Sequence, residues 1–215
     1  MAYTRIKICG ITNAEDALEA VKAGAHFLGF NFYRKSPRYV EPAKVKEILE
    51  YLHEHEADEV LSAGVFVDES AETIHAAMDA SGLRIVQLHG NETPELLEEL
   101  RDYYRIKAVK VSGAKWAQAL DQYDAEAFLA DAPHQTLPGG TGERYDYSLV
   151  SFAAQTHKIF LAGGLTPETV ADAVRAVRPY CVDVASGVEM SPGKKDPAKV
   201  HAFCRAVQEA DQSTS

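Results

Sequence analysis

The sequence has few cysteines and no long apolar run, and both absences limit what the protein can be. Three cysteines occur in 215 residues, far apart and without a Cys-x-x-Cys pair. We therefore expect neither a disulfide framework nor a zinc site, and a reducing cytoplasm fits best. No stretch approaches the ~18 apolar residues of a membrane span, and no basic-then-apolar leader begins the chain. We expect a cytoplasmic protein with no membrane partner.

Positive charge is also scarce. The 32 acidic residues outnumber the 22 basic ones, so the formal net charge is −10. Nucleic-acid binding needs a basic face, so we expect no nucleic-acid partner. The charge also opposes anionic metabolites at long range. If the ligand carries a phosphate, local devices such as helix N-termini or a placed arginine must hold it.

The rest of the composition is typical of a globular protein, with 46% apolar and 25% charged residues and no break between domains. Strand-like apolar runs alternate with helical patterns along the chain. We predict strands over residues 4–9, 27–32, 60–67, 84–89, 106–111, 127–131, 158–161 and 181–185. Helices are predicted over residues 14–23, 43–53, 71–80, 93–100, 116–120, 147–154, 167–177 and 197–207, followed by a disordered tail over 208–215.

Eight strand–helix units of about 27 residues each predict a single-domain α/β fold over residues 1–207, a (β/α)8 TIM barrel. An open doubly wound sheet usually stops at fewer strands, and no GxGxxG motif follows the first strand. In a TIM barrel, catalytic groups lie on the loops after the strands. Candidate site residues are therefore sought at the strand ends.

Two titratable side chains end strands on different sides of the predicted barrel: Cys9 after the first and Asp131 after the sixth. A thiolate that nearby positive charge favours can act as a base. An aspartate in a partly apolar mouth can keep its proton and act as an acid. The pair can then move protons across a ligand bound between them. The alternatives are a small core hydrophobe for Cys9, as expected for Cys181 and Cys204, and a helix cap or salt-bridge partner for Asp131.

Glycine clusters follow the sixth, seventh and eighth strands, where TIM barrels usually bind phosphate. Backbone N–H groups of glycine can approach an anion closely, and the following helices point their positive ends at it. The candidate phosphate-binding residues are Gly142, Gly163, Gly164, Ser186 and Gly187, with the Thr166 hydroxyl as a further donor. The alternative is that these glycines only make tight turns.

Strand alternation predicts supporting residues as well. Lys7 shares the inward face with Cys9, where an unpaired ammonium is costly. Because the first and eighth strands are neighbours in a closed barrel, we predict a buried Lys7–Asp183 ion pair beneath Cys9, lending it positive potential. His89 ends the fourth strand facing inward, either against the ligand or as a satisfied core histidine. Arg38, in a loop that lacks a carboxylate partner, can hold a substrate carboxylate bidentately or remain a solvated charge.

Taken together, the motifs resemble the phosphoribosylanthranilate isomerase family, which catalyses the third step from anthranilate to tryptophan. Each motif alone is weak, but their order and spacing over essentially the whole chain are highly specific. The matching segments are Lys7–Thr12, Ser36–Arg38, Gly64–Val67, Gln87–Gly90, Gly139–Gly142, Gly163–Glu168, Val182–Glu189 and Pro192–Asp196.

The resemblance implies an Amadori rearrangement of N-(5-phosphoribosyl)anthranilate to 1-(2-carboxyphenylamino)-1-deoxyribulose 5-phosphate, without cofactor or metal. It implies that Asp131 protonates the furanose ring oxygen, which opens the ring to a Schiff base, and that Cys9 takes the proton from C2 of the sugar. It assigns the anthranilate carboxylate to Arg38 and the phosphate to the loops after strands six to eight. The expected partner is this small phosphorylated substrate, bound by a monomer or a homodimer.

Two departures from the family pattern concern the closure of the phosphate loop. Glu143 replaces a common lysine, with Arg144 beside it, and Ala185 replaces a common serine. The proton-transfer groups are unaffected.

The rival enzymes are other phosphate-binding barrels. The catalytic lysine–glutamate set of indole-glycerol-phosphate synthase and the metal-binding histidines of pentose-phosphate epimerases do not appear. The two-substrate isomerase that also serves histidine biosynthesis uses paired aspartates in place of a Cys–Asp pair. A non-catalytic or differently specific phosphate-binding barrel is the remaining alternative.

Overall fold

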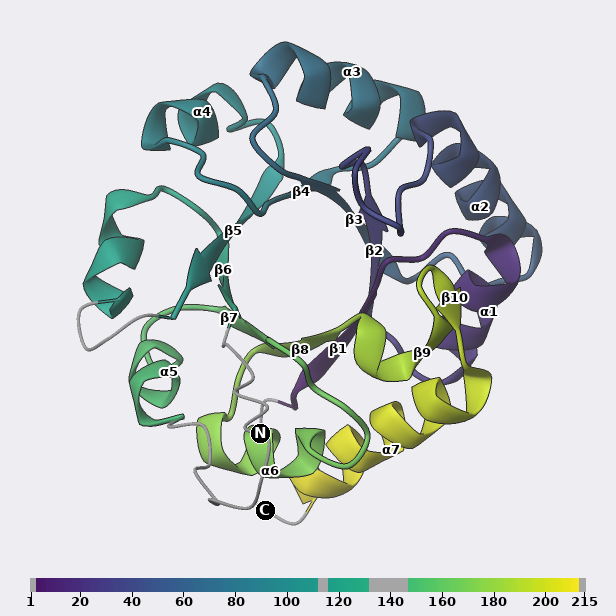
Figure 1. The fold of residues 1–215 in the computed structure, drawn as a ribbon, viewed down its shortest axis with the longest axis vertical. Helices are drawn as coiled ribbons and strands as arrows, with labels where there is room; N and C mark the ends of the chain where they lie inside the picture. Colours follow the sequence, from purple (N-terminus) through teal and green to yellow (C-terminus); the bar gives the residue numbers. More distant parts are fainter. Residues whose placement is uncertain (1–2, 112–115, 132–146, 213–215) are drawn as a thin grey trace.

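The architecture is a closed barrel of eight parallel strands, seen end-on in Figure 1. The computed structural model describes residues 3–111, 116–131 and 147–212. The strands pair in chain order, and the barrel closes because β1 pairs with both β2 and β8. They are β1 Arg5–Cys9, β2 Phe27–Asn31, β3 Leu61–Phe66, β4 Ile85–Leu88, β5 Tyr104–Lys110, β6 Ala127–Asp131, β7 Ile159–Ala162 and β8 Cys181–Val184. The predicted TIM barrel is confirmed.

A ring of helices surrounds the barrel (Figure 1). It comprises α1 Ala14–Lys22, α2 Pro42–Glu54, α3 Ala71–Ser81, α4 Pro94–Glu99, α5 Ser148–Ala153, α6 Val170–Val177 and α7 Pro197–Gln212. Local sequence signals mark the start of several helices. The side chains of Asn13 and Ser70 each accept a hydrogen bond from the backbone N–H three residues later, and α2 and α4 begin with proline. In the described part of the chain, no helix is both long and apolar enough to cross a membrane.

The strands separate two cores because their side chains alternate between two faces. Residues such as Phe27, Leu129, Phe160 and Cys181 fill the barrel interior. The other face packs against the helices in the larger core, which includes Cys204 on α7. Both Cys181 and Cys204 are fully buried, as expected for core residues. The candidate site lies at the carboxyl ends of the strands, where their inward-facing side chains continue beyond the interior core.

The structure differs from the sequence-based expectations in four places. The helix predicted over residues 116–120 is a 3-10 helix, Trp116–Gln122. The helix after β7 begins at Val170, three residues late, because residues 166–169 form a turn. After a 3-10 turn, η2 Ser186–Val188, the chain folds into a short hairpin, β9 Glu189–Ser191 and β10 Lys194–Lys195, that the sequence pattern did not predict.

The fourth concerns the C-terminal tail. Residues 208–212, predicted to be disordered, continue α7, in which Ala210 is buried and Asp211 accepts hydrogen bonds from the N–H and hydroxyl of Thr4. Residues 213–215 lie outside the described residues.

Candidate active site

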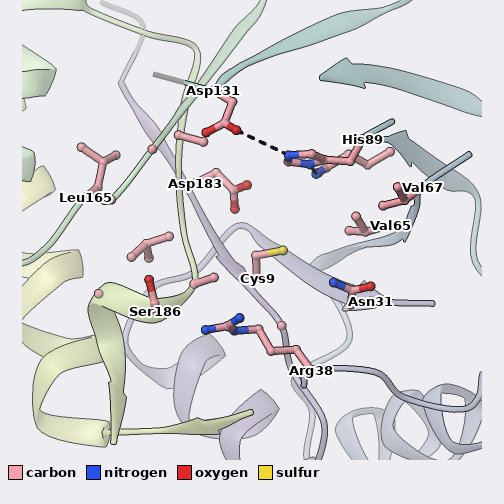
Figure 2. Close-up of a pocket in the computed structure, with 18 residues that line it drawn as sticks. Cys9, Asn31, Arg38, Val65, Val67, His89, Asp131, Leu165, Asp183 and Ser186 are labelled. Atoms are coloured by element: carbon pink, nitrogen blue, oxygen red, sulfur yellow. Dashed lines mark hydrogen bonds and ion pairs between the residues drawn. The ribbon is translucent and has the colours of Figure 1, made fainter. Parts of the chain in front are cut away.

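A cavity of about 280 Å³ lies at the carboxyl ends of the strands. Figure 2 shows Cys9 between Asp131 and His89 on one side and Arg38 on the other. The lining residues are Cys9, Gly10, Asn31, Arg38, Val65, Val67, Gln87, His89, Asp131, Ala162, Gly163, Gly164, Leu165, Asp183, Val184, Ala185, Ser186 and Gly187. Most predicted site residues line it. The exceptions are Lys7, which lies beneath Cys9, Thr166, which lies outside the lining, and Gly142, which falls outside the described residues together with Glu143 and Arg144.

The predicted ion pair beneath Cys9 is confirmed. Strand register places Lys7 opposite Asp183, and Lys7 Nζ lies 3.1 Å from Asp183 Oδ1. The lysine side chain is fully buried and that of the aspartate is 7% exposed. A Cβ atom added to Gly29 on β2 would lie 2.7 Å from Cys9 Sγ and 3.0 Å from Lys7 Nζ. Thiol and ammonium therefore flank the same glycine, and only glycine leaves room for both.

The charge of Lys7 is not sufficient to lower the pKa of the Cys9 thiol below its ordinary value. Burial is the largest influence and raises the pKa of the Cys9 thiol above its ordinary value. Lys7 and Lys195 oppose this effect, while Asp183 adds to it. The expected positive potential is present, but it is weaker than desolvation, which penalises the thiolate. In the free protein the thiol form of Cys9 is favoured, contrary to the prediction.

A second buried lysine supports the backbone around Cys9. Lys195 Nζ donates to the carbonyl oxygens of Cys9 (2.6 Å) and Ala185 (3.2 Å) and to Glu189 Oε1 (3.1 Å). Its side chain is 2% exposed. It therefore ties the end of β1 to the loop after β8. The sequence reasoning missed this role, although Lys195 stood in one of the matching motifs.

Arg38 has a carboxylate partner, contrary to the prediction. Its Nε and Nη2 atoms donate to the two oxygens of Glu189 at 2.8 and 2.6 Å. Glu189 comes from the loop after β8, and the β9–β10 hairpin places it beside Arg38, so the loop composition around Arg38 could not reveal it. A guanidinium carries five N–H donors, and among the described residues no hydrogen bond uses Nη1 of Arg38, which lines the cavity.

Asp131 faces the cavity beside a histidine, as Figure 2 shows. His89 Nε2 lies 3.8 Å from Asp131 Oδ2, and the two side chains are 35% and 37% exposed. The imidazole of His89 lowers the pKa of the Asp131 carboxyl, and this influence is larger than the opposing effect of burial. The expected retention of a proton by Asp131 is therefore wrong for the free protein.

The loops after β7 and β8 meet at the predicted phosphate side of the cavity. A Cβ atom on Gly187 would collide with the carbonyl oxygen of Leu165, so only glycine allows the two loops to approach this closely. Gly163, Gly164 and Ser186 line the same side. Thr166 lies outside the cavity lining, and its backbone N–H donates to Thr169 Oγ1 at 3.0 Å.

The chemical capacity of the cavity follows from these placements. A thiol and a carboxylate, each able to hold or release one proton, face one space, with a guanidinium on one side and glycine-rich backbone on the other. Such a site suits a ligand with two anionic ends and an acid–base reaction between them. Within residues 3–111, 116–131 and 147–212, no group of three or more His, Cys, Asp or Glu side chains is placed to hold a metal ion.

Comparison with known proteins gives one consistent result. The family described as N-(5'phosphoribosyl)anthranilate (PRA) isomerase matches residues 6–206. An N-(5'-phosphoribosyl)anthranilate isomerase from Citrifermentans bemidjiense is 47% identical over 197 residues, which are 92% of this chain and 93% of the relative.

Solved structures agree with this result. The crystal structure of phosphoribosyl anthranilate isomerase from Thermotoga maritima superposes with a TM-score of 0.86 at 40% identity, covering 96% of this chain and 99% of that one. Another phosphoribosyl anthranilate isomerase structure, with a TM-score of 0.83 at 38% identity and the same coverage, is a complex with reduced 1-(o-carboxyphenylamino)-1-deoxyribulose 5-phosphate.

Proposed function

The chain belongs to the N-(5'-phosphoribosyl)anthranilate isomerase family of tryptophan biosynthesis, and we propose that it performs this isomerisation with Cys9 as general base and Asp131 as general acid. The observation that carries the proposal is that both groups face one cavity whose two sides suit the two anionic ends of the substrate. Arg38 holds the anthranilate carboxylate, and Gly163, Gly164, Ser186 and Gly187 hold the phosphate.

The proposal assigns one proton transfer to each of the two groups, before the enolamine becomes the ketone. Asp131 gives a proton to the furanose ring oxygen, and the C1–O bond breaks with its electron pair going to that oxygen, which leaves a Schiff base. Cys9 then removes the proton from C2 of the sugar, and the resulting enolamine becomes the ketone by gaining a proton at C1 and losing one from the oxygen on C2. Each transfer needs a positioned acid or base, and such groups contribute about 10²–10⁴-fold to rates.

In the free protein, the proton shared by Cys9 and Asp131 is on the group that must lack it during the reaction. The thiol of Cys9 and the carboxylate of Asp131 are favoured, whereas the reaction needs a thiolate and a carboxylic acid. Both arrangements contain one proton, so the reactive form requires only its redistribution and no net uptake. The reactive form is therefore a minor fraction of the singly protonated pair.

Activity and residue roles can be tested together. Purified protein should consume N-(5'-phosphoribosyl)anthranilate. The loss of the fluorescence of this substrate measures the reaction. Cys9→Ser and Asp131→Asn should each lower turnover by at least about 10²-fold. Cys204→Ala is the matched control, because Cys204 is buried in the outer core away from the cavity. An unchanged fluorescence signal with wild-type protein would refute the isomerase function, and near-wild-type turnover of Cys9→Ser would refute its role as base.

The ligand class follows from the same cavity. A relative binds the reduced, phosphorylated product analogue named above, and this chain is proposed to bind the same class of molecule. One relative from Thermotoga maritima is described as dimeric. Whether this chain is a monomer or a homodimer stays a prediction, as does its cytoplasmic location.

A further inference from the structure

Two ordered polar side chains at the end of β4, Gln87 and His89, have no part in the proton transfers described so far. Gln87 Nε2 lies 3.0 Å from His89 Nδ1, and His89 Nε2 faces Asp131 Oδ2 at 3.8 Å. The three residues form a row across the cavity wall from β4 to β6. The row ends on the proposed general acid.

Gln87 is built into this row and not merely near it. It is 1% exposed, and its only described side-chain hydrogen bond is the one to His89. Its Oε1 atom is buried without a partner among the described residues. A half-turn of the amide exchanges Nε2 for Oε1 at the same contact. Gln87 can therefore donate to Nδ1 of a neutral His89 or accept from Nδ1–H of an imidazolium.

Asp131 alone is a poor store for the catalytic proton. The neighbouring imidazole keeps the pKa of Asp131 below the ordinary value, so a carboxylic acid is rare near neutral pH. Histidine, by contrast, exchanges its proton near neutral pH. A proton placed on His89 lies next to the carboxylate that must deliver it.

We propose that His89 supplies Asp131 with the proton consumed in ring opening, and that Gln87 holds His89 in both of its charge states. The inference rests on the proposed function of the cavity. The Nε2–H bond of the imidazolium breaks and its proton passes to the Asp131 carboxylate, and Asp131 then gives this proton to the ring oxygen of the substrate as the C1–O bond breaks. The row ends with neutral His89 and an Asp131 carboxylate, and His89 takes up a proton from solvent. His89 acts through Asp131, so it is a positioning residue.

The charged neighbours of His89 come from several elements. Beside Asp131 on β6, Lys107 and Lys110 on β5 line the adjacent hollow that His89 shares. Across the cavity lie Cys9, Asp183 and Arg38. Of the two lysines, Lys107 is engaged by Glu92 at 2.8 Å. All these neighbours remain in a variant that changes His89 alone. Because the His89 imidazole lowers the pKa of the Asp131 carboxyl, the substitution also changes the titration of Asp131.

The test compares the pH profiles of kcat/KM for the wild type and His89→Asn. Asparagine places its amide where Nδ1 of His89 meets Gln87, but it does not titrate. In the wild type the acid limb should follow the protonation state of His89. In His89→Asn the plateau should fall by about 10²-fold, and the limb should move by at least about one unit to lower pH, where Asp131 itself takes up a proton. The phosphate of the substrate titrates identically in both.

His157→Asn is the matched control, because His157 Nε2 lies 3.7 Å from Asp121 Oδ1 in a similar pair outside the cavity. Its profile should match the wild type. A second measurement uses wild-type protein alone: the ¹⁵N shifts of the His89 imidazole should titrate with the midpoint of the acid limb. A lower plateau with an unmoved limb, or a mismatch of the two midpoints, would overturn the relay while wild-type turnover upheld the isomerase. A wild-type protein without turnover would overturn both.

Discussion

The two sides of the cavity are constructed differently. On the base side, Cys9 rests on the Lys7–Asp183 pair and beside Lys195 and Glu189, four charged side chains that are each at most 7% exposed. On the acid side, the Asp131 carboxylate lies 3.8 Å from the His89 imidazole; the side chains are 37% and 35% exposed, respectively. The base side is a buried ionic framework, whereas the acid side is open to solvent.

This difference explains why the pKa values move in opposite directions. On the base side, desolvation outweighs the nearby lysines and raises the pKa of the Cys9 thiol. On the acid side, the His89 imidazole lowers the pKa of the partly exposed Asp131 carboxyl, and it outweighs the opposing effect of burial. Burial thus protects the proton of the base, while the neighbouring imidazole favours loss of the proton of the acid. The buried ion pairs hold the groups of the base side in fixed positions, whereas the groups of the acid side can change their protonation state.

The largest expected effect is on stability, from breaking the framework at its most buried member. Lys7→Met leaves the Asp183 carboxylate without its partner, and breaking a buried pair in this way costs about 3–5 kcal/mol. Unfolding by urea measures the loss. The double variant Lys7→Met/Asp183→Asn, which removes both charges, should recover at least half of it. Recovery of nothing would show that packing, and not the ion pair, supports this side.

The same variant sharpens the electrostatic part of the comparison. Because Lys7 lowers the pKa of Cys9 in the wild type, Lys7→Met should raise it further. The pH dependence of thiol alkylation reports the change. An unchanged pKa would mean that Lys7 contributes structure alone.

The next effect concerns Glu189, which joins Arg38 to Lys195. Glu189→Gln removes the charge on which both cations converge, and a lost hydrogen bond between charged groups costs about 1.5–3 kcal/mol. Arg38 and Lys195 lower the pKa of Glu189 in the folded protein. Its stabilisation is therefore complete above the unfolded pKa, about 4.3, and is lost as the pH falls through the folded value. Urea unfolding at pH 7 and pH 3 should show a smaller difference for Glu189→Gln than for the wild type; equal differences would contradict this linkage.

The contrast between the two sides was only partly predictable from the sequence. Strand alternation and barrel closure suffice to pair Lys7 with Asp183, because both rules depend on local pattern. The partner of Arg38 depends on a two-stranded hairpin that few residues specify, so Glu189 could not be recognised. The protonation of Cys9 and Asp131 depends on the balance between burial and neighbouring charge. A sequence shows which residues are charged, but it does not show how deeply each side chain is buried.

The smallest expected effect is on the open side. His89→Asn should change the free energy of unfolding by less than about 1 kcal/mol, because exposed ion pairs contribute little. The urea midpoint and slope measure this directly, with Lys7→Met unfolded in parallel. A loss as large as that of Lys7→Met would mean that His89 belongs to the structural framework, and the comparison between the two sides would fail.

The most direct test of the proton arrangement is the pH dependence of Cys9 alkylation in the free enzyme. Cys181 and Cys204 are buried, so the reaction reports Cys9. The midpoint should lie above the ordinary cysteine value of 9.0 and should coincide with the alkaline limb of kcat/KM. A midpoint at or below 9.0, or an alkaline limb that does not follow it, would contradict the view that Cys9 is a partly buried thiol which becomes the base only when its proton is moved.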